Sequence, residues 1–379
     1  MGVAELTRNA VHVLPEGALE AKLALGRSLR VKLGIDVTSP DIHVGRGVPL
    51  QRMRAFQDEG HVGVLIVGDY TTRIGDPSGR SMERPMLSED EIDQNADTYV
   101  DQALQILVPE QTEVRRNSEW LAKLSFADVI QLTRMMTVAQ MLERDDFAGR
   151  YSSEQPISVS ELLYPLMQAY DSVAVEADVE LGGTDQLYNL LAGREVMQAY
   201  GLDPQVVLTT PLLLSWDGEK MSSSVGNNIP LTASPEEQFG RTMRISDDLL
   251  EEWYRLVVEA PVPEGDPLES KLALARWIVT RSHGVDAARE AEEHFTRVVR
   301  EGRAPEDIPE HPLPDGDPVH LPALLAAAFG LSTSEARRLI AQGGVKLDGS
   351  VVSELDAPRS ELDGAVVQAG KRRFARLTG

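Results

Sequence analysis

A polar stretch near the N-terminus, residues 34–46, holds side chains that could bind a phosphate group. Apolar residues precede it and a pattern of helical spacing follows it, so we expect a strand that turns sharply into a helix. Such a turn directs backbone N–H groups and the positive end of the helix at one point, which favours an anion. Gly45 would let a phosphate come close, and His43 and Arg46 could donate hydrogen bonds to it. Taken alone, the stretch is more typical of an ordinary helix cap.

Two further stretches place polar side chains where a ligand could meet them. A glycine-rich loop at 75–80 follows the apolar run 62–70, which predicts a buried parallel strand. Together with the preceding strand and helix this run forms a βαβ unit, and such sheets bind ligands at the carboxyl ends of their strands. Tyr164, Gln168 and Asp171 are spaced to share one helix face, which is either the wall of a polar pocket or a solvated surface.

Polar loops also follow two later strands. Residues 173–179 alternate and predict a strand, and 180–189 predict a second glycine-bearing turn from strand to helix. An apolar strand is expected at 206–210, continued by 211–216. In the following loop, Lys220 precedes three serines, which together offer one cation and several hydroxyls to phosphate oxygens. This loop alone is more typical of a surface turn.

Helices are expected in most of the remaining chain. The region 88–150 is mostly helical, with Ser88 as an N-cap and Glu91 completing a capping box. Residues 235–300 also predict helices, and they carry no evident chemistry. Three methionines at helical spacing are assigned to core packing: Met135, Met136 and Met141.

Composition restricts the class of protein. The chain of 379 residues is long enough for two or three domains, and it has no cysteine for a disulfide, a zinc thiolate or a nucleophile. No apolar run is long enough for a membrane span, and no export signal is visible, so we expect a cytoplasmic protein. The net charge of −23 argues against nucleic-acid binding by the chain as a whole.

The C-terminal end has a different character. Residues 301–318 contain five prolines among acidic residues and glycines, and they predict a linker. Residues 321–379 form a compact unit, in which a short basic helix after Ser334 is stopped by glycines and a hairpin with an Asp-Gly turn spans 345–352. This unit holds eight Lys/Arg against six Asp/Glu, whereas the residues before it are strongly acidic.

Taken together, these stretches resemble the bacterial tyrosyl-tRNA synthetases, a family of class I aminoacyl-tRNA synthetases. The residues at 43–46 (HVGR) and 220–224 (KMSSS) are similar to the HIGH and KMSKS signatures, and the stretches at 75–80, 164–171 and 182–186 match further motifs in order. Five motifs in one order are specific, whereas each alone is weak. The terminal unit resembles the RNA-binding domain first seen in ribosomal small-subunit protein four.

The resemblance implies an α/β fold with four parts. A Rossmann-like parallel-sheet catalytic domain would span 1–232, with a helical insertion and dimer contact at about 88–190. A helical anticodon-binding domain would follow at 233–300, then a linker at 301–320 and the small α+β RNA-binding domain at 321–379. The family forms homodimers, and no membrane contact is implied.

The implied reaction is tyrosine–tRNA ligation. The tyrosine carboxylate attacks the α-phosphate of ATP to give tyrosyl-adenylate and pyrophosphate, and the tyrosyl group then passes to the terminal ribose of tRNA(Tyr). Magnesium is expected with ATP as substrate, without a tightly bound cofactor or a protein metal site. The step needs alignment and neutralisation of phosphate charge more than covalent help.

The resemblance also assigns roles to matching positions. Residues expected to act on the phosphates are His43, Arg46, Thr38, Lys220, Arg80 and Arg84. Residues expected to bind ATP are Asp36, Gly45, Gly183, Asp185, Lys220, Ser222 and Ser223. Residues expected to bind tyrosine are Asp76, Tyr164, Gln168 and Gln186 around its amino and carboxyl groups and Asp171 at its phenol. Residues expected to bind RNA are Arg337, Arg338, Lys346, Lys371, Arg372 and Arg373.

Three positions depart from the family pattern. Arg46 replaces the second histidine of the first signature, and Ser223 replaces the second lysine of the other. One gained and one lost cation could compensate each other. Lys32 stands where one branch of the family has a tyrosine that contacts the phenol, and no role is assigned to it. An RNA-binding or regulatory paralogue with weakened adenylation is therefore an alternative, as is a ligase for a related aromatic amino acid.

Overall fold

The computed structural model describes residues 2–77, 87–301, 308–370 and 373–379. Its residues pack as two compact units, Met1–Ala233 with Arg244–Leu274 and Ser234–Met243 with Ala275–Gly379. The segment 244–274 packs with the first unit, where the Trp253 indole donates to the Leu214 carbonyl at 3.0 Å and the Asn9 amide donates to the Arg255 carbonyl at 2.7 Å.

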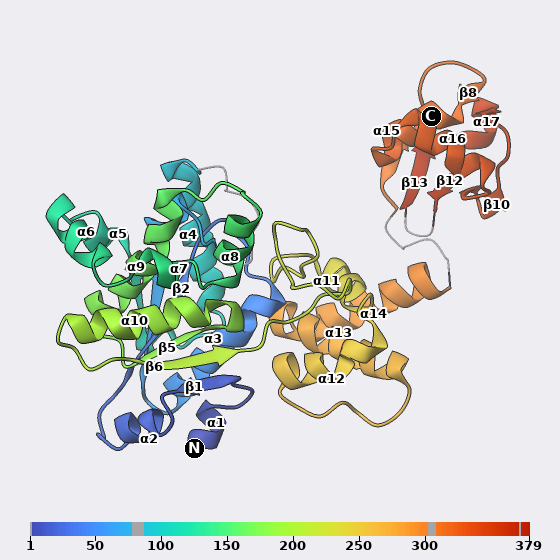
Figure 1. Ribbon diagram of the computed structural model, residues 1–379. Coiled ribbons are helices and arrows are strands. Elements are labelled where there is room, and N and C mark those ends of the chain that lie inside the picture. Colours follow the sequence, from blue (N-terminus) through green and yellow to red (C-terminus); the bar gives the residue numbers. More distant parts are fainter. Residues whose placement is uncertain (1, 78–86, 302–307, 371–372) are drawn as a thin grey trace. The chain divides into compact units, whose positions relative to one another are not determined.

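A six-stranded sheet forms the centre of the first unit (Figure 1). Its strands run in the order β1-β6-β5-β2-β3-β4, and only β1 is antiparallel to its neighbour. This arrangement confirms the expected Rossmann-like class. The strand bounds are β1 His12–Leu14, β2 Arg30–Ile35, β3 Val62–Val67, β4 Thr112–Arg116, β5 Val179–Gly183 and β6 Val206–Thr210.

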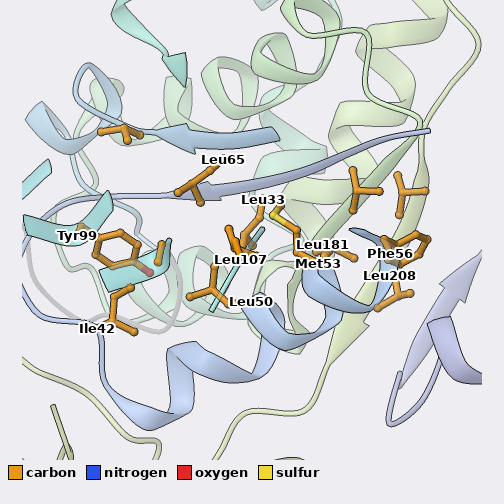
Figure 2. Packing of buried hydrophobic residues seen from close by; sticks show 14 of the residues in the cluster. Leu33, Ile42, Leu50, Met53, Phe56, Leu65, Tyr99, Leu107, Leu181 and Leu208 are labelled. Atoms are coloured by element: carbon orange, nitrogen blue, oxygen red, sulfur yellow. The ribbon is translucent and has the colours of Figure 1, made fainter. Parts of the chain in front are cut away.

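One face of this sheet packs against helices α3 (Val44–Asp58) and α4 (Glu89–Ala103). Figure 2 shows Leu33, Leu65, Leu181 and Leu208 of the strands beside the side chains of these helices. Because successive residues of a strand point to opposite faces, alternate positions of β2, β3, β5 and β6 supply this core. Helix α4 begins with the expected capping box of Ser88 and Glu91.

The opposite face packs against α9 (Val159–Ala174) and α10 (Leu187–Ala199). A second core lies between these helices and the segments before them, and Met136 and Met141 are buried in it as expected, with Met135 partly buried against them. This face of the sheet is not wholly apolar. Lys32 and Glu180 stand directly opposite each other on the neighbouring parallel strands β2 and β5, and both side chains are buried.

Two expected strands are wrong. Val173 and Ala174 end helix α9, and Glu176 takes a left-handed φ of 49° that turns the chain, so strand β5 begins only at Val179. The alternation at 173–179 is therefore the end of a helix followed by a turn. Residues 211–216 do not continue β6, because they make only an isolated bridge between Leu214 and Lys220. The polar strand β4 lay in a region expected to be helical.

The remaining elements of the first unit are short helices and turns. They are α1 Val3–Leu6, α2 Ala18–Leu23, η1 Thr71–Arg73, η2 Pro109–Gln111, α5 Ser118–Leu121, α6 Phe126–Thr133, α7 Val138–Met141, α8 Asp145–Ser152, η3 Thr184–Gln186, η4 Asp247–Leu249, α12 Leu250–Trp253 and η5 Tyr254–Val258.

The second unit contains a group of helices and a small sheet. The helices α11 (Pro235–Thr242) and α14 (Val285–Phe295) pack through Phe239 and Phe295, whose ring centroids lie 5.5 Å apart. Helix α13 (Pro267–His283) crosses the boundary between the units, and η6 spans Thr296–Arg300.

The C-terminal sheet has the strand order β10-β9-β12-β13-β7. Its elements, with two short strands that pair separately, are β7 Glu310–Pro312, β8 Val319–His320, α15 Leu321–Phe329, α16 Thr333–Ala341, β9 Val345–Leu347, β10 Ser350–Val351, β11 Asp356–Ala357, α17 Arg359–Leu362, β12 Val366–Ala369 and β13 Arg373–Thr378. The expected hairpin is confirmed, because β9 pairs with β10 and both Asp348 and Gly349 have positive φ.

Two details of this end differ from expectation. The linker expected over 301–320 is too long, because β7 pairs with β13 and both Leu313 and Val319 are buried in the C-terminal core. Helix α16 is capped by Ser332, which forms a capping box with Glu335, and not by Ser334. The polar, proline-rich stretch therefore contains a strand, β7, which pairs with β13 at the end of the chain.

Candidate active site

A cavity of about 640 Å³ opens at the carboxyl ends of β2, β3, β5 and β6. It lies at the point where α3, after β2, and α10, after β5, leave the sheet toward opposite faces, which is where open α/β sheets bind ligands. Expected site residues that line it are Asp36, Thr38, His43, Gly45, Arg46, Asp76, Tyr164, Gln168, Asp171, Gly183, Asp185, Gln186, Lys220, Ser222 and Ser223. Stretches far apart in the sequence therefore meet at one pocket.

His43 is the N-cap of helix α3, and it lies in the stretch expected to turn from strand to helix. Its Nδ1 accepts from the backbone N–H of Arg46 at 3.3 Å, so in the neutral ring the proton is on Nε2. Burial, helped by the charges of Arg46 and Lys220, lowers the pKa of His43 to about 3. The ring is therefore a neutral donor at physiological pH. Gly45 lies against it, since a Cβ there would stand 3.2 Å from Nδ1.

Arg46 supplies a permanent cation at the start of the same helix. Its guanidinium carbon lies 5.7 Å from the centroid of the Tyr99 ring, and its Nη1 is buried with no hydrogen-bond partner among the residues described. A buried donor without a partner is costly, so this atom suits an anionic ligand that enters the cavity.

Asp171 lies at the other end of the cavity and is fully enclosed. Its carboxylate accepts from the Trp120 indole at 2.8 Å and from the Asn117 amide at 3.3 Å. Burial is the largest influence and raises the pKa of Asp171 to about 7, while the charge of Lys32 and the two donors act in the opposite direction. Trp120 and Asn117 belong to or precede the short helix α5, and no motif in the sequence pointed to them.

Two further carboxylates lie together beside Tyr164. Asp36 accepts from the Tyr164 hydroxyl at 3.0 Å, from Thr71 at 2.8 Å and from the backbone N–H of Asp76 at 3.1 Å. Burial, followed by the negative charge of Asp76, raises the pKa of Asp36 to about 6. Asp36 thus lies with the residues expected to hold an ammonium group, although the sequence suggested a nucleotide contact.

Two glutamines complete this group. Gln186 donates from its amide to Asp76 at 2.6 Å and accepts from Asn189 at 3.1 Å, which fixes its orientation. The side-chain oxygen of Gln168 is buried and has no hydrogen-bond partner in the described part of the chain. It is therefore an acceptor available to a cationic ligand in the cavity.

Lys220 and Asp185 form an ion pair in the lining of the cavity. The lysine Nζ lies 2.5 Å from the Asp185 carboxylate, and the two side chains are 51% and 20% exposed. A pair as exposed as this contributes little stability, so ligands that match each partner can separate it. Gly183 lets the side chains of Asp185 and Leu212 lie close to the backbone, because a Cβ would stand 2.5 Å from the Asp185 carboxylate and 2.7 Å from Leu212, and both side chains would have to shift.

The loop after Lys220 is held by its own polar contacts. Asn227 donates to Asp217 at 2.9 Å and accepts from the backbone N–H of Ser222 at 2.8 Å. The Ser223 hydroxyl accepts from the Asn228 amide at 3.3 Å. These hydrogen bonds order the loop, so Ser222 and Ser223 line the cavity and do not belong to an irregular surface turn.

The remaining expected residues are not among those described as lining the cavity. Arg80 and Arg84 are outside the described residues, as are Lys371 and Arg372. Arg337, Arg338 and Arg373 are exposed and Lys346 is half-buried, all in the C-terminal part of the second unit. Arg337 donates to the His320 ring at 3.3 Å.

Similarity to known proteins identifies the class of protein first. Residues 24–300 match the family described as tRNA synthetases class I (W and Y), and residues 321–356 match the S4 domain. The Archaeoglobus fulgidus tyrosyl-tRNA synthetase complexed with L-tyrosine has a similar fold, with a TM-score of 0.63, 22% identity, and coverage of 76% of this chain and 98% of that one. The family match and the fold are thus those of a class I tRNA synthetase.

The particular family follows from closer relatives. A tyrosine–tRNA ligase of Moorella thermoacetica is 49% identical over 98% of this chain and 94% of its own length. One from Thermotoga maritima is 44% identical over 99% of this chain and 96% of its own length. The chain belongs to the tyrosine–tRNA ligase family of class I tRNA synthetases.

The described residues lack two further features. No helix among them has the length and apolarity needed to span a membrane. No group of three or more His, Asp or Glu side chains among them is placed to hold a metal ion.

Proposed function

We propose that the chain activates L-tyrosine with ATP and transfers it to tRNA(Tyr). The observation that carries this proposal is the enclosed Asp171, a hydrogen-bond acceptor at the deep end of a cavity whose mouth carries cations. A phenol hydroxyl is the part of tyrosine that phenylalanine lacks, and a buried acceptor left without its donor disfavours the wrong substrate. Membership of the tyrosine–tRNA ligase family supports the same substrate.

The group around Tyr164 is suited to the amino end of tyrosine. Asp36 and Asp76 are carboxylates, and the free oxygen of Gln168 is an acceptor, so the set matches an ammonium group. Gln186, oriented by Asn189, would lie near the tyrosine carboxyl group. Alignment of that carboxylate with the α-phosphate is the main requirement of the first step.

The other end of the cavity is suited to ATP. Neutral His43 and cationic Arg46 stand at the start of α3, where the helix dipole favours phosphate. Asp185 would accept from the ribose hydroxyls, which frees Lys220 for the departing pyrophosphate. Magnesium would enter with ATP and be bound mainly through phosphate oxygens. We include Thr38, Ser222, Ser223, Arg80 and Arg84 in the proposed phosphate-binding set.

The partners beyond the active site are also proposals. The exposed Arg337, Arg338 and Arg373, with Lys346, Lys371 and Arg372, would bind RNA phosphates through the S4 domain. Homodimer contact through the helical region 88–190 is supported by large apolar side chains that are exposed there, namely Phe126, Ile130, Val138, Tyr151 and Val159. A catalytic, an anticodon-binding and an RNA-binding part of the chain and a cytoplasmic location belong to the same proposal.

An amino-acid panel tests the function directly. We expect ATP–pyrophosphate exchange with tyrosine at a rate at least 100-fold above that with phenylalanine or tryptophan, because Asp171 requires a donor. A reaction without amino acid is the blank. Exchange with another aromatic amino acid in place of tyrosine would contradict the substrate, and absence of exchange with tyrosine would favour the RNA-binding paralogue.

The two altered signatures provide a second prediction. If Arg46 compensates for the missing lysine at Ser223, then R46H should slow adenylation about tenfold, and R46H/S223K should recover most of that loss. Single-turnover formation of tyrosyl-adenylate by R46H, S223K and R46H/S223K measures these rates. The matched control is R46H/S224K, which adds the same charge one residue away and should not recover the rate. Strictly additive effects of the two changes would exclude compensation.

A further inference from the structure

Beneath the phenol end of the cavity lies a buried polar network that the proposed reaction does not use. Lys32 has no exposed surface, and its Nζ lies 2.7 Å from Glu180, 2.8 Å from the Ser172 hydroxyl and 3.0 Å from the Gln168 carbonyl. Glu180 in turn accepts from Ser172 at 2.8 Å and from the Gln205 amide at 2.7 Å. Every Lys32 donor therefore has an acceptor.

This network is built into the fold at several points. Lys32 and Glu180 are register partners on β2 and β5, Ser172 comes from α9, and Gln205 precedes β6. Gly193 of α10 leaves the space for it, because a Cβ at that position would lie 2.5 Å from the Gln205 amide nitrogen and 3.1 Å from Glu180. A buried ion pair is weak as a source of stability, so its role needs another explanation.

The contacts of Lys32 converge on one turn of α9. Gln168 and Ser172 are the two residues of α9 that its Nζ contacts, and Asp171 lies between them. Lys32 does not line the cavity, whereas Gln168 and Asp171 do. The lysine therefore holds the helical turn that presents the phenol acceptor, and it places a positive charge behind that acceptor.

On the basis of the proposed function, we propose that the Lys32–Glu180 pair is a positioning device that fixes the turn of Asp171 and keeps its carboxylate ionised for the phenol of tyrosine. Lys32 acts through Asp171 and not on the substrate. The lysine favours the charged carboxylate, and Glu180 partly offsets it, so the two members should influence tyrosine binding in opposite directions.

The groups that face Asp171 define what its titration depends on. Lys32 on β2 lowers its pKa and Glu180 on β5 raises it, while Trp120 and Asn117 donate to it and lower it. Tyr164 on α9 also faces it, and burial raises the pKa of that phenol well above its ordinary range, so it stays neutral. The pKa of Asp171 is about 7, so the carboxylate is ionised above that pH and protonated below it.

The test is the pH dependence of tyrosine binding by the full chain, measured by calorimetry between about pH 5.5 and 8.5. The wild-type affinity should fall up to about tenfold per pH unit below the pKa of Asp171. In E180Q the positive charge of Lys32 is no longer offset by Glu180. The pH at which tyrosine affinity is half of its maximum should therefore move to lower pH by about one unit. In K32M/E180Q both charges are absent, and the pH midpoint of tyrosine binding should move to higher pH by about one unit. This shift weakens tyrosine binding about fivefold at pH 7.

A matched control separates this effect from loss of stability. K22M/D178N removes another buried ion pair, whose charged atoms lie 3.6 Å apart, just before the start of β5 and outside the cavity. Its pH profile should match that of the wild type even if its melting temperature falls.

If K32M/E180Q does not fold, E180Q alone still tests the inference. A shift of its pH midpoint to lower pH supports the inference, and no shift contradicts it.

The outcomes separate the two proposals. Opposite shifts of the midpoint in the two variants support the inference. Equal loss of affinity at every pH, or no shift in either variant, would overturn it and leave Lys32 a purely structural residue. A wild-type chain that binds no tyrosine at any pH would instead contradict the proposed function.

Discussion

Replacement of Asp171 by alanine is expected to lower kcat/KM for tyrosine in pyrophosphate exchange by roughly 1,000-fold, or about 4 kcal/mol. The variant loses a hydrogen bond to a charged acceptor, which contributes about 1.5–3 kcal/mol. It also leaves the phenol hydroxyl of bound tyrosine buried without an acceptor, at a further cost of about 1–3 kcal/mol. The KM for ATP should stay nearly constant, because the phosphate end of the cavity is unchanged.

Two control variants make this result specific. Asp178→Ala removes another buried aspartate, which accepts from Arg27 at 2.7 Å and lies outside the cavity, so it should lower stability without the loss in kcat/KM. Asp171→Asn keeps the shape of the side chain but not its charge, and should fall between alanine and the wild type. Near-normal exchange by Asp171→Ala would show that the phenol is recognised elsewhere.

The second large effect concerns stability. Lys32→Met alone should destabilise the first unit by about 3–5 kcal/mol, because it leaves the fully buried Glu180 without its cation. For a unit of more than 200 residues, a loss of this size lowers the melting temperature by roughly 10 °C. Thermal unfolding followed by circular dichroism and calorimetry measures the shift.

The double variant K32M/E180Q distinguishes an unpaired charge from a packing defect. Removal of both charges should recover most of the stability, since a buried pair replaced by neutral side chains costs little. If the double variant were as unstable as Lys32→Met, the loss would have to come from the space left by the lysine stem. The stability of Glu180→Gln alone is also measured. With the wild type, Lys32→Met and K32M/E180Q it completes a double-mutant cycle, which gives the interaction energy of the pair.

The sequence was informative where function depends on short local signals. The helix start at His43, the common face of Tyr164, Gln168 and Asp171, and the loop at Lys220 all followed from local spacing. Their meeting at one cavity followed from a general rule, because parallel strands bring their carboxyl ends to the same edge of a sheet. Local rules and topology therefore predict which stretches meet at one edge of the sheet, whereas the roles of the individual residues come from the family resemblance.

The sequence was misleading where an element depends on a distant partner. Strand β5 contains a glutamate and two glycines, which are unusual in a central strand, and the glutamate is explained only by Lys32 on β2. The apolar alternation just before it was mistaken for the strand. In the same way β7 is a strand only because β13, at the end of the chain, pairs with it.

Neutral donors around a buried charge are also hard to predict. Trp120 and Asn117 hold Asp171 from a four-residue helix that has no periodicity to recognise. The left-handed turn at Glu176 also cannot be predicted from the sequence, because glutamate rarely adopts a positive φ. Both are set by tertiary packing and not by local preference.

The close approach of Gly193 to the buried network limits how this binding site can change. A methyl group at that position would displace Gln205, and Gln205 supports the carboxylate that neutralises Lys32. The residues behind the phenol end of the site therefore depend on one another although they come from separate elements. Redesign of its amino-acid specificity, in the laboratory or in evolution, would have to replace that block together and not one position at a time.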